Sequence, residues 1–432
     1  MKIFNRKKKN KRAVKRKKSI RKNMIKKFFR NVKSSINPKT SQSSNYQTKN
    51  KADFVSLSLI AILTLFGWIM VYSASFYVAS QRANTLFSAY NSFHYFILQG
   101  IWILLGSILA FIAYKLNLKY YKALIVPAYI IIFILLVIVL FMPEINGANL
   151  WIKIGPFTLQ PSEFSKPVLI ILLSLILSKK RTTKAKNTKT ILKHYIRQRL
   201  LPFSLAVIPI VFLVIIGKDL ASAALIAGIS LIMLFFSEDT AINNLLTSGS
   251  TILGALAGTV FIAIEPYRLK RIETFLHFLL SGSVSDPLNT GYQLRQILIA
   301  VGTGGIFGYG FGQSRQKYYY LQETAFTDTI FAVIAEEFGL FGSTLILIAF
   351  GVLILRGIKI ANQANTRFSA LIALGVTIWL FLQTIIHLSV NVGLFPLTGI
   401  TLPFMSYGGS SLLTCLIGGG MLLNISKEVK LD

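Results

Sequence analysis

The feature that most restricts the fold is a series of apolar runs, each long enough to cross a lipid bilayer. A helix needs roughly 20 apolar residues to cross about 30 Å of hydrocarbon. The runs lie near 55–76, 95–114, 122–142, 164–178, 201–217, 220–236, 244–264, 330–355, 369–390 and 404–425. With 53% hydrophobic and 14% charged residues, the chain has more apolar surface than a soluble domain can bury. The sequence therefore predicts an all-α integral membrane protein with about ten transmembrane helices.

Basic residues fall in alternate connections between these runs. Short cytoplasmic loops of membrane proteins collect Lys and Arg. The connection from Lys179 to Arg199 carries nine of them, and the connections at 115–122 and 356–367 are also basic. The connection at 237–244 lacks this support, because it has two acidic residues and no cation. The alternation places the N- and C-termini in the cytoplasm.

The first 52 residues form a polar, strongly basic segment. They hold twenty of the 47 Lys and Arg residues and account for most of the net charge of +32. The segment has no apolar stretch long enough for a signal peptide, so we expect a disordered cytoplasmic tail at 1–52 and a polytopic membrane domain at 53–432. Each basic residue near a charged leaflet contributes about 1 kcal/mol, which favours anionic lipid as the partner of the tail. Protein docking and RNA contact are the alternatives for the tail, and no nucleic-acid partner is expected for the chain.

The connection at 265–327 is the one long segment predicted to lie outside the cell. Loops longer than about 15 residues in a compact protein are usually functional or disordered. Its first part, 267–280, places Leu269, Ile272 and Phe275 on one helical face, as in a helix lying in the membrane interface. Its second part, 292–320, is rich in glycine and is expected to form a re-entrant hairpin. The single cysteine, Cys415, lies in an apolar run and excludes a disulfide framework.

Ionisable side chains at membrane depth are costly, so each is a functional candidate until a partner explains it. Glu163 and Lys166 are three residues apart, shortly after Trp151 and Gln160. They share a helical face if a helix starts near Ser162, which is then expected to cap it. A structural ion pair is one reading. The other is a cation presented to a diphosphate, with the carboxylate orienting it.

A second cluster precedes the apolar run at 330–355 and consists of Arg315, Lys317, Glu323 and Asp328. The glycine-rich run at 308–312 does not join a strand to a helix, so a nucleotide-binding fold is excluded. Asp328 opens the following span, where the helix dipole favours a carboxylate. An N-cap and a catalytic base are the two readings of this residue.

Two further groups complete the candidates. Asp219 follows Lys218 at a turn between two apolar runs, where a helix cap is the simpler reading. The last group consists of the segments 391–396 and 402–411, and the second of these is rich in small residues and includes Ser410 and Ser411. Small residues let helices approach closely or let the backbone line a cavity, so packing and substrate binding both fit.

Four motifs in this order carry a resemblance that none of them carries alone. They are Val71-Tyr-Ser-Ala-Ser75, Gln160-Pro-Ser-Glu-Phe-Ser-Lys166, Thr327-Asp328 with Glu336-Glu337-Phe-Gly339, and the segment 402–411. Together they resemble the shape, elongation, division and sporulation (SEDS) family of peptidoglycan polymerases, from about Asp53 to the C-terminus. The segments 312–317 and 356–361 are similar to the family's FtsW branch.

The resemblance implies a glycosyltransferase that joins lipid II units into glycan strands on the outer face of the bacterial inner membrane, at the division septum. Undecaprenyl diphosphate leaves from the growing chain. The implied partners are lipid II, the growing strand, a class B penicillin-binding transpeptidase and division-site proteins. The family's essential aspartate falls on Asp328, with the role of general base. The diphosphate needs positive charge, implied to come from Lys166, Arg315, Lys317 or a bound Mg or Mn ion. The implied substrate-binding set also includes Glu163, Trp151, Gln160, Glu323, Ser410 and Ser411.

The chain departs from the family's usual letters at five positions. Leu150 stands for arginine, Lys218 and Gln322 for proline, Phe326 for histidine and His387 for asparagine. Because Asp328 is retained, activity is expected. Two rival functions remain from other classes. A transporter of lipid-linked precursor predicts interrupted helices in two repeated halves, and the sequence shows no convincing repeat. A catalytically silent scaffold that recruits a transpeptidase differs from an enzyme only through Asp328.

Overall fold

Long apolar helices dominate the computed structural model, which describes residues 51–83, 91–144, 147–155, 157–179, 195–237, 266–289 and 291–429. Within this part, seven helices are long and apolar enough to cross a membrane. The chain is therefore a multi-pass membrane protein, as its composition predicted. The seven are α2 (Phe54–Ala83), α3 (His94–Lys115), α4 (Leu118–Val139), α7 (Leu201–Ile216) with the π-helical turn Ile196–Leu200 before it, α13 (Ile330–Gln363), α14 (Arg367–Asn391) and α15 (Gly409–Ser426).

Shorter elements complete the described fold. They are the apolar helices α5 (Pro161–Leu177) and α8 (Leu220–Phe236), the strands β1 (Ile152–Ile154) and β2 (Phe157–Leu159), the helices α10 (Pro266–Ser281), α11 (Tyr292–Thr303) and α12 (Gln316–Tyr319), and the 3-10 turn η2 (Gln322–Thr324). Each predicted apolar run other than 244–264 coincides with a helix. The run at 244–264 lies outside the described residues, so the count of ten spans stays a prediction.

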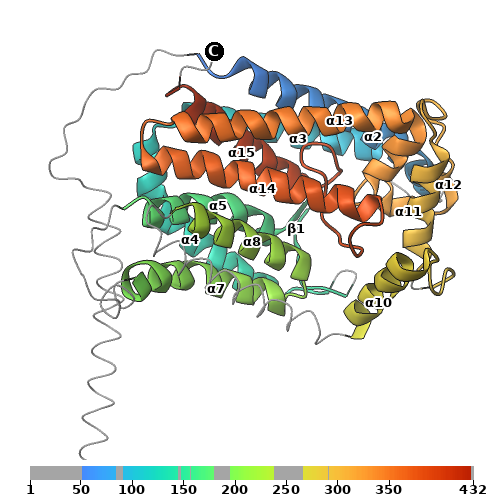
Figure 1. Cartoon of the computed structure of the whole chain (residues 1–432), viewed down its shortest axis with the longest axis horizontal. Helices are drawn as coiled ribbons and strands as arrows, with labels where there is room; N and C mark the ends of the chain where they lie inside the picture. The colour runs from blue at the N-terminus through green and yellow to red at the C-terminus, as the bar shows by residue number, and fades with distance from the viewer. Residues whose placement is uncertain are drawn as a thin grey trace, which may run out of the picture.

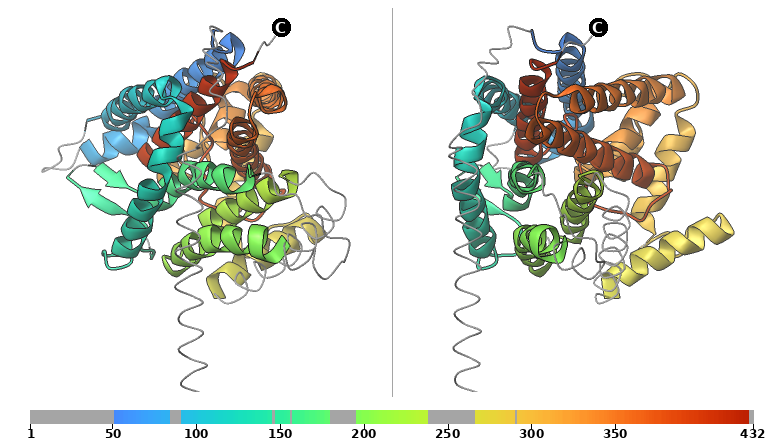
Figure 2. Two further views of the ribbon diagram at one scale, coloured as in Figure 1. Left: turned by 90° about the vertical axis from the view of Figure 1, so that its left-hand side faces the viewer. Right: turned by 60° about the vertical axis from the view of Figure 1, so that its left-hand side comes forward.

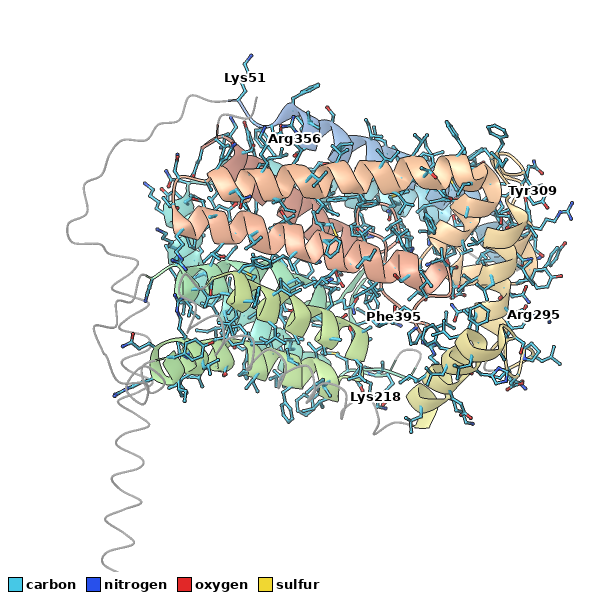
Figure 3. The ribbon with its side chains drawn as sticks, in the orientation of Figure 1. Lys51, Lys218, Arg295, Tyr309, Arg356 and Phe395 are labelled. Carbon is cyan, nitrogen blue, oxygen red and sulfur yellow. The ribbon has the colours of Figure 1, made fainter. Side chains whose placement is uncertain are left out.

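The helices form a bundle with two distinct ends. In Figure 1, α10, α11 and α12 gather at one end of α13 and α14, which we call the loop end. The amphipathic helix expected at 267–280 is present there as α10. Figure 2 shows α10 standing away from the long helices in a second view. Lys51 and Arg356 are at the opposite end, labelled in Figure 3, which we call the termini end.

The starts of α8 and α5 test two predicted caps. Asp219 is the N-cap residue of α8 and accepts a hydrogen bond from the Ser222 backbone N–H at 3.0 Å, so the predicted cap is confirmed. The expected cap by Ser162 is wrong. Helix α5 starts at Pro161 with Gln160 as N-cap residue. Proline fits the first helical position because it lacks the N–H that would be left unpaired there.

A β-hairpin is the one described exception to the all-helical expectation. The strands β1 and β2 pair antiparallel, with Ile152 opposite Leu159. Between them Gly155 has a φ of 61°, which suits a residue without Cβ. The hairpin leads directly into α5 and packs against α15, because the Ser410 hydroxyl accepts from the Gln160 N–H at 2.9 Å. It positions the start of α5 at the loop end.

The core of the bundle lies around α14 and α15. Trp379 of α14 is fully buried, and glycines of α15 allow close helix contact. A Cβ on Gly420 would come within 2.3 Å of the Ala110 carbonyl oxygen of α3, and one on Gly418 within 2.9 Å of the Trp379 ring. Small residues at such seams let membrane helices approach and gain dispersion energy. Within the segment 402–411, a Cβ on Gly409 would likewise come within 2.3 Å of the Trp102 ring of α3, which fits the packing reading of that segment.

Helix α13 is broken at Gly339, whose φ of 63° and ψ of −160° are not helical. A break at membrane depth leaves backbone groups without partners unless protein supplies them. The segment 304–310, after α11, fills this break. Four bonds join them: Tyr309 N–H to Glu336 O at 3.0 Å, Gly310 N–H to Glu337 O at 2.9 Å, Leu340 N–H to Gly305 O at 2.9 Å and Phe341 N–H to Ile306 O at 3.0 Å. The glycine-rich segment predicted to be re-entrant thus inserts into α13.

Substitution of Gly420 by alanine should destabilise the fold, because the added methyl group meets backbone of α3 that cannot rotate away. We expect a loss of about 1 to 3 kcal/mol, the usual cost of overpacking. The matched control is Gly351→Ala on α13, where a Cβ meets nothing within 4 Å. Thermal unfolding of both variants in detergent, followed by the loss of the monodisperse species, measures the difference. Equal stability of the two variants would contradict the tight α3–α15 seam.

Candidate functional site

Glu163 and Lys166 form a buried ion pair at the loop end of α5. The Lys166 ammonium group donates to both Glu163 carboxylate oxygens at 2.8 Å and to Gln383 Oε1 of α14 at 3.2 Å. The Lys166 side chain is 1% exposed and the Glu163 side chain 8%. Trp379 donates to the same Gln383 oxygen at 2.6 Å. The predicted shared helical face is confirmed, and the burial favours the structural reading of the pair.

Hydrogen bonds tie the neighbouring candidates together around this pair. Gln160 Nε2 donates to Asp219 Oδ2 at 3.0 Å, while its backbone N–H donates to Ser410. The Ser411 hydroxyl lies 2.7 Å from the Thr401 hydroxyl. Burial raises the pKa of Asp219, and hydrogen bonds from Ser222 oppose that rise. These contacts join the β-hairpin, α5, α8 and α15 into one wall.

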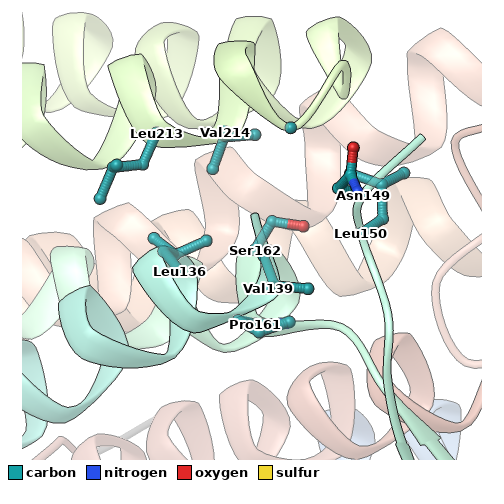
Figure 4. Close-up of a pocket in the computed structure, with 9 residues that line it drawn as sticks. Leu136, Val139, Asn149, Leu150, Pro161, Ser162, Leu213 and Val214 are labelled. Atoms are coloured by element: carbon teal, nitrogen blue, oxygen red, sulfur yellow. The ribbon is translucent and has the colours of Figure 1, made fainter. Parts of the chain in front are cut away.

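The remaining predicted residue of this wall is Trp151, which directly precedes β1 and is half-buried. A small pocket lies beside it, between α4, α5 and α7 (Figure 4). Its lining includes Leu150, Asn149 and Ser162 and is mostly apolar. It has room for about one water molecule. The pocket is therefore too small for a sugar or a diphosphate.

A second buried ion pair lies next to the break in α13. Lys317 of α12 lies 2.6 Å from Glu337 Oε1, with side chains 3% and 0% exposed. The Ser73 hydroxyl of α2 donates to Glu337 Oε1 at 2.7 Å, and Lys317 donates to that hydroxyl oxygen at 2.8 Å. Burial lowers the pKa of Lys317, although the nearby Glu337 carboxylate counteracts this. The ammonium group of Lys317 is therefore paired with the Glu337 carboxylate.

The adjacent residue Glu336 holds the start of α12. Its Oε1 accepts from the Arg315 backbone N–H at 3.0 Å, and its Oε2 accepts from the Gln316 N–H at 3.2 Å and from the Ser314 hydroxyl. The carboxylate therefore satisfies N–H groups that a helix start leaves unpaired. The Arg315 side chain is exposed and lies 5.3 Å above the Tyr309 ring. Together, Glu336 and Glu337 fix 314–317 on α13.

Asp328 lies between η2 and α13 at the loop end and is half-buried. Its Oδ1 accepts from the Thr327 hydroxyl at 2.9 Å, and its backbone carbonyl accepts from Asn391 Nδ2 of α14 at 3.1 Å. Asn391 also accepts from the Ala332 N–H at 3.2 Å, which ties the first turn of α13 to α14. The N-cap residue of α13 is Thr329. Asp328 is therefore not the N-cap residue of α13, and the interpretation of Asp328 as a helix cap is wrong.

The electrostatic surroundings of Asp328 include a residue that the sequence did not single out as part of the site. Burial raises the pKa of Asp328, and the hydrogen bond from Thr327, a backbone hydrogen bond and, as the smallest effect, the positive charge of Arg271 on α10 oppose that rise. A carboxyl group with a raised pKa is better matched to accepting a proton near neutral pH. Arg271 is part of the charged face of the amphipathic helix, so its place in the sequence gave no sign of Asp328.

Glu323 and Arg82 form a surface pair close to Asp328. Arg82, in the last turn of α2, contacts the Glu323 carboxylate of η2 and donates to the Tyr95 hydroxyl. The side chains of Arg82 and Glu323 are 39% and 61% exposed. Arg82 follows the first apolar run, in the last turn of α2. A cation at the outer end of a span was the sequence signal that could have identified it as part of the site.

The predicted metal has no preformed site among the described residues. No group of three or more His, Cys, Asp or Glu side chains comes together there in a way that could hold an ion. Mg and Mn prefer several oxygen ligands, and the described neighbours of Asp328 that bond it are a hydroxyl and an amide. A divalent cation therefore stays a prediction of the resemblance.

Comparison with known proteins places the chain among sequence relatives of similar length. Stage V sporulation protein E of Bacillus subtilis is 37% identical over 384 residues, covering 88% of this chain and 98% of that protein. The probable peptidoglycan glycosyltransferase FtsW of Coxiella burnetii is 37% identical, covering 87% of this chain and 95% of that protein. The corresponding protein of Trichlorobacter lovleyi is 35% identical, covering 88% and 94%.

Solved structures support the same relationship. A peptidoglycan synthase complex, described for its structural coordination of polymerization and crosslinking, contains a chain with a TM-score of 0.65 and 26% identity, covering 88% of this chain and 99% of that one. Rod shape determining protein RodA of Thermus thermophilus has a TM-score of 0.60 at 23% identity, covering 90% and 100%, and shows the fold alone. The model of the FtsW, RodA and SpoVE family matches residues 54–431. The chain belongs to this family of cell cycle proteins.

Proposed function

We propose that this chain is a peptidoglycan glycosyltransferase that polymerises lipid II on the outer face of the cytoplasmic membrane. Relatives named as probable peptidoglycan glycosyltransferases, 34 to 37% identical over most of their length, support the activity. The observation that carries the mechanism is the half-buried Asp328 carboxyl group at the loop end, held between α13 and α14. The same end carries the exposed cation Arg315.

In the proposed step, a hydroxyl group of the acceptor sugar attacks the anomeric carbon of the donor. A new C–O bond forms as the bond from that carbon to the diphosphate oxygen breaks. Asp328 takes the hydroxyl proton, and undecaprenyl diphosphate leaves with the bonding electron pair. General-base catalysis needs the carboxylate within hydrogen-bond reach of that hydroxyl group.

The leaving diphosphate needs positive charge where its charge develops. Of the predicted cations, Lys166 and Lys317 are held by buried carboxylates, while Arg315 is exposed. We therefore assign the contact with the diphosphate to Arg315, and assign to Glu163, Gln160, Ser410 and Ser411 the shaping of one wall. We assign to the exposed Glu323 and the half-buried Trp151 direct contact with the sugar units.

The topology proposed for this function has ten spans, with both termini in the cytoplasm and the loop end outside. The alternation of basic connections supports it. The solved complex named for polymerization and crosslinking supports a cognate crosslinking transpeptidase as partner. The family's description as a cell cycle protein supports a place at the division septum with other division proteins. The basic tail is assigned to anionic lipid.

The transporter alternative meets a specific obstacle in α13. Interrupted helices in transporters expose backbone groups to a substrate or ion near the midplane. In α13 the carbonyl groups of Glu336 and Glu337 are already bonded to Tyr309 and Gly310. The interruption is filled by the chain itself, which favours the enzyme.

Asp328→Asn should reduce polymerisation of labelled lipid II by roughly 100-fold or more, because the amide cannot accept the proton. Folding and lipid II binding should persist, since the Thr327 and Asn391 contacts allow an amide. The matched control is Glu144→Gln, a half-exposed carboxylate at the loop end paired with Lys218. Near wild-type elongation by Asp328→Asn would refute the enzyme assignment and leave the scaffold.

Single substitutions do not separate a structural role of Glu163 and Lys166 from a role in substrate binding. Neutralising both residues together does. Each single variant, Glu163→Gln or Lys166→Met, leaves a buried unpaired charge and should cost about 3 to 5 kcal/mol of stability. The double variant removes both charges, so we expect it to recover folding and most polymerisation. Thermal unfolding and lipid II polymerisation are measured on all three. A double variant that folds but stays inactive would show that Lys166 serves the substrate.

The topology is tested by reporter fusions placed in the two longest connections. A fusion after Lys189 should report a cytoplasmic position, because that connection is strongly basic. A fusion after Ser285 should report an external position. Paired alkaline phosphatase and fluorescent protein fusions give opposite signals at each site, which controls for expression. Both sites on one side of the membrane would overturn the ten-span topology.

A further inference from the structure

Arg82 lies at the loop end of α2, beside the turn that leads to Asp328. It is in the last turn of the helix, and its guanidinium group contacts the Glu323 carboxylate of η2. The same guanidinium group donates to the Tyr95 hydroxyl of α3. Arg82 is therefore held between α3 and η2.

Short contacts connect η2 with the proposed base. The Thr327 hydroxyl donates to Asp328 Oδ1 at 2.9 Å and lies 3.1 Å from the Glu323 carbonyl oxygen. The hydroxyl of Thr329, the N-cap residue of α13, donates to the Thr324 carbonyl oxygen at 2.7 Å. The turn that carries Glu323 is thus fixed to the segment that carries Asp328.

The cation already assigned to the diphosphate lies on a neighbouring element. Arg315 is the N-cap residue of α12, and α12 packs against the loop end of α2 (Figure 1). The Tyr77 ring of α2 lies 5.3 Å from the Tyr318 ring and 5.4 Å from the Tyr319 ring of α12, measured between centroids. Arg82 and Arg315 are therefore on two elements that contact each other at the loop end.

The pair of Arg82 and Glu323 differs from the two buried lysine pairs in its exposure. The Arg82 side chain is 39% exposed and the Glu323 side chain 61%, whereas those of Lys166 and Lys317 are 1% and 3% exposed. An ion pair this open to water adds little stability, because water screens it and fixing two long side chains costs entropy. Replacing its carboxylate by another anion is therefore easy.

We propose that Arg82 binds the diphosphate of the lipid substrate, and that the Glu323 carboxylate occupies the guanidinium group until the diphosphate displaces it. A guanidinium group forms two parallel hydrogen bonds with a carboxylate or with phosphate oxygens, so one anion can replace the other in the same geometry. The inference rests on the proposed function and adds a second arginine to Arg315 at the diphosphate. Once displaced, the Glu323 carboxylate contacts the sugar units to which it is assigned.

The exchange predicts opposite effects for the two partners. Arg82→Gln removes the guanidinium group and should weaken binding of the diphosphate roughly 10-fold or more, as expected for a lost charge-assisted hydrogen bond. Glu323→Gln removes the competing carboxylate and should strengthen binding roughly 2- to 5-fold, the range that an exposed ion pair implies. A purely structural ion pair predicts instead that both substitutions act in the same direction.

The binding probe is undecaprenyl diphosphate, which carries the diphosphate without sugars or peptide. Its dissociation constant is measured in detergent for the full-length protein and for Arg82→Gln, Arg82→Lys and Glu323→Gln, with thermal unfolding of each. The sugar contact assigned to Glu323 does not enter, because the probe has no sugar. Arg82→Lys keeps the charge without the two-pronged geometry and should bind the probe with intermediate strength.

The matched control is the ion pair of Lys218 and Glu144, which is also at the loop end. Its side chains are similarly open, with Lys218 44% exposed and Glu144 50%. Lys218→Gln and Glu144→Gln change the net charge by the same amounts as Arg82→Gln and Glu323→Gln. Both control variants should bind the probe as the wild-type protein does, because their pair does not hold the diphosphate.

Two outcomes overturn the inference. One is a Glu323→Gln variant that binds the probe no better than the wild-type protein, because the carboxylate then does not compete. The other is an Arg82→Gln variant that retains binding of the probe while its KM for lipid II rises or stays unchanged, because Arg82 then does not contact the diphosphate. If Arg82→Gln does not fold, Glu323→Gln and Arg82→Lys decide by the same measurement. Failure of the proposed function shows separately, as polymerisation by Asp328→Asn.

Discussion

The break in α13 at Gly339 is the constraint on which the loop end depends. A helix interrupted inside a membrane is stable only when other backbone or side chains satisfy the freed groups. Here the segment 304–310 supplies both donors and acceptors, and a Cβ on Gly308 would come within 2.2 Å of the Glu337 carbonyl oxygen. The close backbone approach therefore requires glycine at 304 and 308, whereas a Cβ on Gly305 would meet nothing within 4 Å. The arrangement fixes the short first part of α13, and Asp328 stands directly before it.

Two buried ion pairs decide where positive charge is available at the loop end. Lys166 and Lys317 each meet a carboxylate inside the protein, and such pairs hold geometry more than they add stability. The side chains of Arg315, Arg82 and Arg271 at the loop end are exposed or half-buried. A guanidinium group stays charged when partly buried and forms two-pronged bonds to phosphate oxygens. The arginines therefore suit an anionic substrate better than the buried lysines do.

Two departures from the family's letters have a backbone reason. Lys218 and Gln322 replace proline and have φ values of 68° and 44°. The proline ring fixes φ near −65°, so proline could not adopt either conformation. Phe326, in place of histidine, packs between the Tyr95 and Tyr407 rings at centroid distances of 4.6 and 5.5 Å. Aromatic contacts therefore hold the turn before Asp328.

The sequence by itself determined the membrane class, the positions of the described spans, the amphipathic helix α10 and the face shared by Glu163 and Lys166. Apolar run length and helical spacing are local properties, and they need no knowledge of neighbours. Only the tertiary structure decided that Ser162 is not a cap, that a hairpin precedes α5 and that α13 is broken. It also decided that Lys317 is buried and that Arg271 donates to the Leu397 carbonyl oxygen, 126 residues further along the chain. These depend on which helices meet, and the burial of a charge is a property of its neighbours rather than of its own spacing.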